Sequence, residues 1–358
     1  MAKVGLAAQA FGLLWGRGSL PPRTWTADAR FLEFARRNVI VVRCEEALRA
    51  RRGPVATELA DAAEAERLRI RQTVGFVGEL GDLCARHGIE FVFTKAFQHL
   101  PDMGHDVDLF VGDRSDRIDR LICCAYPCAP GADSLSNRVA GKTSWEVEGQ
   151  PTPLEVHHGR LGHVGEHESY AAMLLRRRIQ VDIAGIRTLV PAPEDQLILQ
   201  VLQRVYSHLS LRVSDVVHTV HLFRHDMDWT YILKTTRRIG IFGGLCCYLR
   251  YVEAICRTVG ESLSHPEAWK PLAEKGWGDI RLGRWHYRFP VVSIPGWLYG
   301  KKLAHDLGSR NWGGAGRLLL LAPLALAAAG RAVLRRAARG RSRPSPGGKI
   351  KSDAEAPV

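Results

Sequence analysis

Two carboxylates at alternate positions of a short apolar run have the spacing of a metal site. Asp106 and Asp108 alternate with Val107, Leu109 and Val111. Because side chains two apart on a β-strand point to the same face, the aspartates are expected to project together and the apolar residues to enter a core. Adjacent carboxylates repel each other unless a cation lies between them. Mg²⁺ (or Mn²⁺) binds one or two protein carboxylates together with the phosphate oxygens of a nucleoside triphosphate (NTP), which is the arrangement that phosphoryl-type transfer needs.

A third acid lies on a later strand. The run Leu154-Glu155-Val156-His157 predicts a strand with Glu155 and His157 on one face. If that face meets the aspartates, Glu155 completes a carboxylate triad and activates the acceptor hydroxyl or holds the metal near it. His157 and His158 are adjacent and must face opposite ways, so one of them is expected to be structural. The competing interpretation of each acid is a strand that exposes carboxylates to water.

A basic residue ends the strand that precedes the aspartates. The run Ile89-Glu90-Phe91-Val92-Phe93 is typical of a buried strand. Thr94-Lys95-Ala96 follows it, and a loop containing Pro101 and Gly104 then leads to His105, directly before Asp106.

The order and spacing of these pieces resemble an uncharacterised nucleotidyltransferase-like family of bacterial genomes, a branch of the polymerase-beta-type superfamily. The family pattern has a strand ending in Lys-Gly-small, a loop with a basic or polar residue, an Asp-hydrophobic-Asp strand and a later acid-hydrophobic-His strand. The resemblance covers about residues 55–260. It implies an α+β fold with a small mixed sheet, metal-binding and catalytic roles for Asp106, Asp108 and Glu155, and nucleotide contacts from Lys95, Thr94 and His105.

One position departs from the family pattern. Ala96 stands where glycine normally lets backbone amides approach a phosphate, and a Cβ limits that approach. Lys95 would compensate as a point charge on the triphosphate. A catalytically degenerate module that keeps the fold is the alternative.

Periodicity and composition divide the chain into four parts: a helical leader (1–55), an α/β core (56–190), a helical part (191–310) and an apolar helix with a basic, disordered tail (311–358). Apolar residues at helical spacing predict a helix from Ala56 to His87, ended by Gly88. Within the core, strands are expected at Ser144–Glu148, Thr152–His158 and Ile186–Val190, and a helix at Tyr170–Arg178. Pro193 is expected at a helix start.

Composition narrows the classes of protein. A length of 358 residues with 46% hydrophobic content is ample for a core, and the absence of a short repeat excludes fibres and solenoids. The eight cysteines lack zinc-site spacing and include two adjacent pairs, so we expect reduced thiols, mostly in the core, and a cytoplasmic protein.

The C-terminal part predicts contact with an anionic surface. The net charge is +13, and much of the excess follows Arg331. The apolar run Leu318–Ala329 is shorter than the about 20 residues of a spanning helix and contains Pro323. We expect peripheral contact of residues 311–343 with the inner face of a membrane. The alternative is a helix packed on the protein with a solvated tail.

Two functions follow. The first is a Mg²⁺-dependent enzyme that moves NMP from an NTP to a hydroxyl of an RNA end, a protein side chain, a sugar or a small molecule. The second is a non-catalytic module of the same fold that binds a membrane or nucleic acid. The deciding feature is whether Asp106, Asp108 and Glu155 converge.

Overall fold

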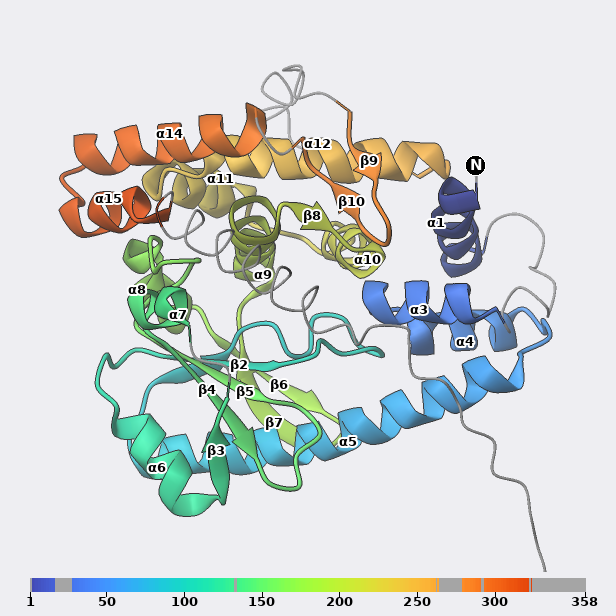
Figure 1. Ribbon diagram of the computed structural model, residues 1–358, viewed down its shortest axis with the longest axis horizontal. Helices are drawn as coiled ribbons and strands as arrows, with labels where there is room; N and C mark the ends of the chain where they lie inside the picture. The colour runs from blue at the N-terminus through green and yellow to red at the C-terminus, as the bar shows by residue number, and fades with distance from the viewer. Residues whose placement is uncertain are drawn as a thin grey trace, which may run out of the picture. The chain divides into compact units, whose positions relative to one another are not determined.

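The computed structural model describes residues 2–16, 28–131, 134–261, 263, 279–290, 293–321 and 323. Residues Met1–Leu318 form one compact unit, shown in Figure 1. The turn residues Ser19-Leu20-Pro21-Pro22 predict a loop, and Gly276-Trp277-Gly278 predicts a helix break. Both segments lie outside the described residues, as does most of the apolar run after Leu321.

Four helices open the chain: α1 (Ala2–Leu14), α3 (Ala29–Asn38), α4 (Val41–Ala50) and α5 (Thr57–Arg86). The predicted long helix is confirmed as α5, which ends because Gly88 adopts a left-handed φ of 64° and the Ile89 N–H bonds to the Cys84 carbonyl at 2.9 Å. Helix α4 is capped by a distant residue. The N–H groups of Val42 and Arg43 donate to Asp102 at 2.8 and 3.0 Å, which satisfies first-turn amides that the helix itself leaves unpaired.

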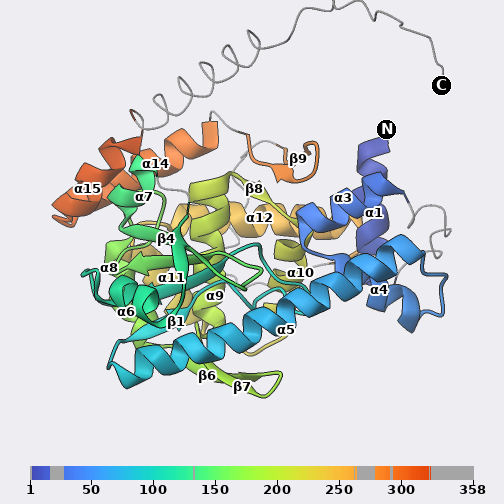
Figure 2. The same cartoon turned by 60° about the horizontal axis from the view of Figure 1, so that its bottom comes forward.

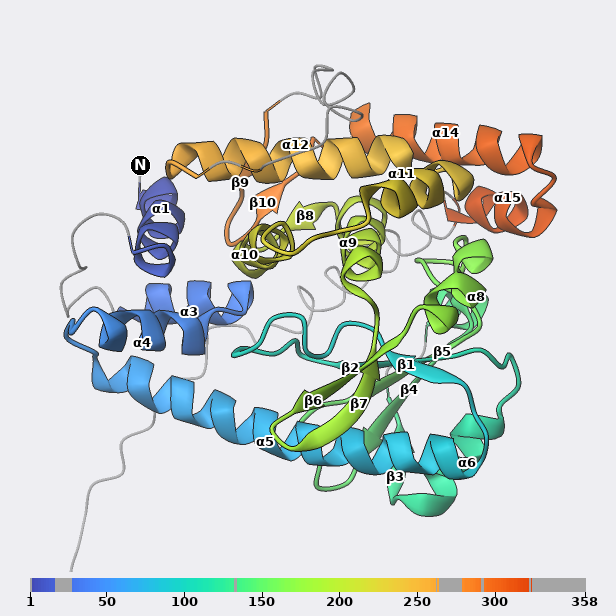
Figure 3. The ribbon, with the colours of Figure 1, turned by 180° about the vertical axis from the view of Figure 1, so that it is seen from behind.

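A five-stranded mixed sheet follows, in the order β1-β2-β5-β4-β3. Its strands are β1 (Phe91–Phe93), β2 (Val107–Val111), β3 (Cys128–Pro130), β4 (Lys142–Val147) and β5 (Leu154–His158), with α6 (Arg117–Ala125) and α7 (Leu135–Ala140) between them. Strands β2 and β5 pair in parallel, and the other pairs are antiparallel. Helix α8 (Glu168–Arg176) then leads to a two-stranded ribbon, β6 (Ile179–Ile183) and β7 (Ile186–Val190), which lies beside α5 in Figure 3.

The second half is mostly helical. Pro193 starts α9 as expected. The elements are α9 (Pro193–Val201), the π-helix η1 (Leu202–His208), β8 (Ser210–Leu211), α10 (Val213–Leu222), α11 (Trp229–Arg238), α12 (Phe242–Thr258), β9 (Arg281–Leu282), β10 (Tyr287–Arg288), α14 (Ser293–Gly308) and α15 (Trp312–Leu319). The short strands join in a small sheet of order β8-β10-β9.

The two faces of the five-stranded sheet meet different partners. On one face Val107, Leu109 and Val111 pack with residues of α5 and α6; Figure 2 shows α5 running along this side of the molecule. On the other face Val92 and Phe110 belong to a core shared with the N-terminal helices and the helical half. The alternation read from the sequence is therefore confirmed, and it turns the polar residues of β2 and β5 toward the helical half.

The structure confirms the α+β class and adds elements that the sequence did not predict. Strands β3 and β6, helix α7, the small sheet and the π-helix were all missed. The second predicted strand begins at Val107, so Asp106 directly precedes it. All eight cysteines are free; Cys44, Cys84, Cys246, Cys247 and Cys256 are buried. Among the described helices, none has the length and apolar character to cross a membrane.

Candidate active site

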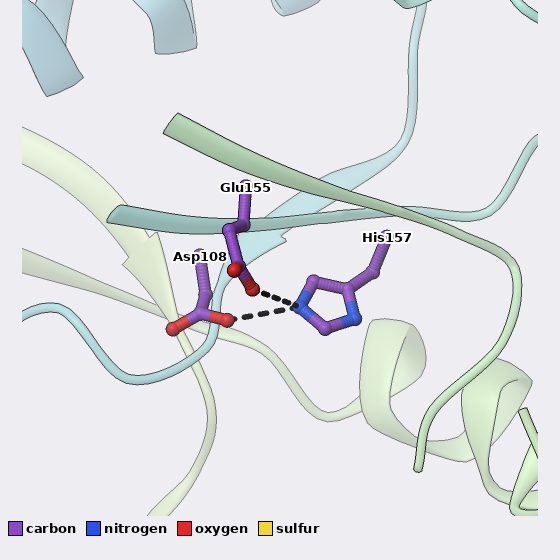
Figure 4. Close-up of side chains that lie close together, drawn as sticks. All are labelled: Asp108, Glu155 and His157. Carbon is purple, nitrogen blue, oxygen red and sulfur yellow. Dashed lines mark hydrogen bonds and ion pairs between the residues drawn. The ribbon is translucent and has the colours of Figure 1, made fainter. Parts of the chain in front are cut away.

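Strand pairing brings two of the predicted acids together. Asp108 on β2 lies directly opposite Glu155 on β5 in the parallel register, and residues opposite each other share a face of the sheet. His157, two residues beyond Glu155, lies on the same face. One ligand atom from each of these three residues lies within 4.8 Å of the others. Figure 4 shows the three side chains converging.

Asp108 is the centre of this group. It is 1% exposed. Its Oδ1 atom lies 2.6 Å from Lys95 Nζ and 2.9 Å from His157 Nε2. Burial alone would raise the pKa of Asp108, but the charge of Lys95 and the hydrogen bond from His157 hold that pKa well below its usual range. An ionised carboxylate only accepts hydrogen bonds, so His157 Nε2 must be the donor.

His157 is held neutral. Burial lowers the pKa of its ring to about 4. The Nε2 atom also lies 3.9 Å from Glu155 Oε2, whereas the buried Nδ1 atom has no hydrogen-bond partner among the described residues. His158 faces the other way, as expected, and bonds to Asp119 and Thr143 at 3.1 Å each. The prediction that the two adjacent histidines face opposite ways, and that one of them is structural, is therefore confirmed.

Asp106 stands at the edge of this group. It is partly buried and does not join the set of three ligand atoms. It nevertheless interacts electrostatically with Asp108, because the negative charge of Asp108, together with burial, raises the pKa of Asp106 to about 6. Such a shift is expected for two neighbouring carboxylates, because the charge on one disfavours ionisation of the other.

Glu155 has a cationic partner that the sequence analysis missed. Lys142, the first residue of β4, places Nζ 3.3 Å from Glu155 Oε2. The site thus carries two ammonium groups, Lys95 and Lys142, against its carboxylates. The sequence contains no local signal for Lys142, since its position depends on the register in which β4 pairs with β5.

A small cavity opens beside these groups, with a volume of about 110 Å³. Thr94 and Lys95, which the sequence predicts as nucleotide contacts, line this cavity, and Lys142 and His157 line it as well. Thr94 is 3% exposed and its Oγ1 atom has no partner in the described part of the chain. His105 is exposed and is not one of the lining residues. The remaining lining residues come from the segment after β5, from α7 and from the α9–η1 region: Asn137, Leu161, Gly162, His163, Leu199, Leu202, Gln203, Ser207 and His208.

This arrangement can bind a divalent cation and an anion side by side. Carboxylate oxygens are the ligands that Mg²⁺ prefers, and Asp108 and Glu155 offer them from adjacent strands. The ammonium groups of Lys95 and Lys142 are point charges suited to phosphate. Ala96, 1% exposed, occupies the position where the family pattern has glycine, and its Cβ limits the approach of a phosphate to the backbone there.

Comparison with known proteins agrees with the geometry. The model of a family described as uncharacterised nucleotidyltransferases matches residues 26–257, which is more than half of the 358 residues. No curated protein matches the chain. The matched range contains Asp108, Glu155 and the cavity lined by Lys95, Lys142 and His157. The chain therefore belongs to this family of nucleotidyltransferases.

Proposed function

We propose that the protein is a Mg²⁺-dependent (or Mn²⁺-dependent) nucleotidyltransferase that moves NMP from an NTP to an acceptor hydroxyl. The observation that carries the proposal is the convergence of Asp108 and Glu155 on one sheet face, beside a cavity lined by two lysines. Family membership supports the same chemistry. The fit to a metal is favourable, since hard carboxylate oxygens converge there and the existing countercharges are two lysine ammonium groups.

In this proposal Asp106, Asp108 and Glu155 would hold the ion. A divalent cation supplies charge stabilisation for the attacking and leaving oxygens. His157 donates its Nε2–H to Asp108 and fixes the orientation of that carboxylate. Glu155, whose side chain is 28% exposed against 1% for Asp108, would accept the proton of the acceptor hydroxyl as that hydroxyl attacks the α-phosphate and pyrophosphate leaves.

The cations and the hydroxyl of the cavity bind the triphosphate. Lys95 lies at the end of β1 and Lys142 at the start of β4, so the two ammonium groups approach the cavity from opposite sides of the carboxylates. On nucleotide binding both transfer from carboxylate to phosphate oxygens, and Thr94 donates its hydroxyl. Removal of Lys95 is expected to weaken nucleotide binding by about 1–3 kcal/mol, the scale of a charged hydrogen bond.

The test is transfer itself. The full chain is incubated with labelled NTPs and Mg²⁺ in four parallel pools that contain RNA, proteins, sugars and small metabolites. The matched variants are Asp108→Asn and Asp119→Asn, since Asp119 is also a buried aspartate but lies on α6, against the opposite face of the sheet. Label that enters an acceptor with wild type and Asp119→Asn, and not with Asp108→Asn, supports the proposal. No transfer in any pool, with no binding of NTP, identifies a degenerate module instead.

We also propose that residues 311–343 bring the protein to an anionic membrane surface, at the cytoplasmic face. The supporting observation is that Trp312 and Leu319 are 66% and 62% exposed, and large exposed apolar residues are typical of interfacial helices. Two findings limit the contribution of neighbouring residues: Leu318 is buried, and Arg317 pairs with Glu168.

Sedimentation with anionic vesicles tests this proposal. Wild type should co-sediment at low salt and be released at high salt. Trp312→Ala should bind less, whereas Leu68→Ala, which removes an equally isolated exposed leucine from α5, should bind like wild type. If the wild type stays in the supernatant at low salt, the segment is a packed helix with a solvated tail. Resistance to alkaline carbonate would identify an integral protein.

A further inference from the structure

The far wall of the cavity is built from a strained segment. Leu202, Gln203, Ser207 and His208 line the cavity from the π-helix η1. A π-helix is a rare and unfavourable backbone form that occurs most often at functional sites. It ends at Leu209, a leucine with φ of 53°, in the left-handed region that non-glycine residues rarely adopt. The π-helix and the left-handed backbone of Leu209 are both unfavourable conformations, and their occurrence together beside the cavity indicates a role beyond packing.

The polar atoms of the cavity require partners that the described residues do not provide. The buried Oε1 atom of Gln203 has no hydrogen-bond donor among them, and Thr94 Oγ1 and His157 Nδ1 are likewise unpartnered. Thr94 and His157 are each 3% exposed. Buried polar groups in folded proteins are nearly always paired. Gln203 Oε1 and the unprotonated Nδ1 of His157 can only accept hydrogen bonds, so they match a ligand group that donates one, as a hydroxyl does.

Size and position identify which part of a nucleotide fits. A volume of about 110 Å³ is well below the roughly 300–1,000 Å³ of pockets that enclose a whole small-molecule ligand. It accommodates one moiety of a nucleotide. Lys95 and Lys142 hold the phosphates at one side, and the sugar is the group covalently next to the α-phosphate. A nucleotide bound in this way directs its ribose toward η1.

We propose that η1 forms the ribose-binding wall of the nucleotide site and selects ribonucleotides over their deoxy analogues. Gln203 Oε1 accepts a hydrogen bond from a ribose hydroxyl, and Ser207, one turn further along η1, contacts the sugar beside it. This inference rests on the proposed function, because it takes the ligand to be a nucleoside triphosphate. It specifies ribonucleotides as the substrate class and assigns the selectivity to Gln203, which lies outside the cluster of carboxylates.

Binding of non-hydrolysable triphosphates in the presence of Mn²⁺ tests the inference on the full chain. The probes are α,β-methylene ATP and its 2′-deoxy and 3′-deoxy forms. Wild type is expected to bind the ribonucleotide about tenfold tighter than at least one deoxy form, the factor that corresponds to about one hydrogen bond. Gln203→Met removes the acceptor at similar volume and should bring the ribonucleotide down to the affinity of that deoxy form.

Two further variants keep the outcome interpretable. Gln203→Glu retains an acceptor oxygen and should retain the preference. Gln196→Met is the matched control, because Gln196 lies on α9, bonds to the Pro191 carbonyl at 3.0 Å and does not line the cavity. Melting temperatures show whether Gln203→Met folds, and loss of an unpaired interior oxygen should leave the melting temperature unchanged or raised.

The possible failures are distinguishable. Equal binding of all three probes by wild type overturns the inference and leaves the proposed function in place. Preference for the ribonucleotide that survives in Gln203→Met also overturns it, since the selectivity then comes from elsewhere. Absence of binding to any triphosphate overturns the proposed function and the inference together.

Discussion

Replacement of Lys95 by methionine should convert a salt-bridged carboxylate into an open metal ligand. In the wild type, Lys95 Nζ lies 2.6 Å from Asp108 Oδ1, and the Asp108 side chain is 1% exposed. Removing one partner of a buried pair costs about 3–5 kcal/mol because the remaining charge is unpaired. Asp108 keeps the hydrogen bond from His157, so we expect the lower end, about 3 kcal/mol, for Lys95→Met without metal.

Divalent metal should then recover most of that loss. A ligand that binds only the folded state adds about 2.7 kcal/mol of stability when its concentration is a hundred times its dissociation constant. In Lys95→Met the ion meets no competing ammonium group on Asp108, whereas in wild type it must first displace Lys95. Mn²⁺ should therefore raise the free energy of unfolding of Lys95→Met by more than it raises that of wild type.

Urea unfolding followed by circular dichroism, with and without Mn²⁺, measures both effects. The matched control is Lys302→Met, because Lys302 is fully buried and places Nζ 2.6 Å from both carboxylate oxygens of Asp306. That variant should lose comparable stability and recover little with Mn²⁺, since Asp306 belongs to no group of potential metal ligands in the described structure. Equal recovery of both variants, or no greater recovery in Lys95→Met than in wild type, would refute the reasoning.

Two other predictions concern aspartates outside the carboxylate group. Burial raises the pKa of Asp102 from 3.8 to about 6, so the folded protein holds this proton more tightly than the unfolded chain. Asp102 should therefore contribute a loss of about 3 kcal/mol to the stability of the wild type as the pH rises from 4 through 6; Asp102→Asn should make this slope shallower than that of wild type in urea unfolding, and an unchanged slope would contradict the assignment. Asp119 accepts hydrogen bonds from Thr143 and Trp145, both at 2.7 Å, and ties α6 to β4. Asp119→Ala should cost about 2–4 kcal/mol with no change in the stabilisation by Mn²⁺, and loss of the Mn²⁺ effect would show that the two faces of the sheet are not independent.

Local patterns in the sequence carried the prediction of individual elements. The alternation around Asp108 identified the core face of β2, because a strand repeats every two residues and Val107, Leu109 and Val111 all proved buried. The long helix α5 followed from apolar spacing over many turns and from the glycine after it. The opposite directions of His157 and His158 needed only the geometry of a strand.

Features that depend on pairing between distant segments could not be predicted in this way. The contact of Lys142 with Glu155 requires the register of β4 on β5, and a shift by one residue would turn that lysine to the other face. Lys95 pairs with Asp108 because the pairing of β1 with β2 brings the two residues together. That pairing cannot be read from the local sequence. The π-helix carries no periodic signal of its own, since it continues directly from α9.

The charges of the site explain why metal and nucleotide should bind together. Asp106, Asp108 and Glu155 face Lys95 and Lys142, and the pKa of about 6 for Asp106 shows that the excess negative charge is already unfavourable without a cation. A divalent ion alone relieves this repulsion but must compete with two ammonium groups for the carboxylates. A triphosphate alone draws those ammonium groups away and leaves the carboxylates uncompensated. In the proposed function, the lysines would pair with phosphate and the ion with carboxylate when both ligands bind, so each ligand would remove the obstacle to the other. By reciprocity of linked equilibria, the factor by which nucleotide tightens metal binding must equal the factor by which metal tightens nucleotide binding.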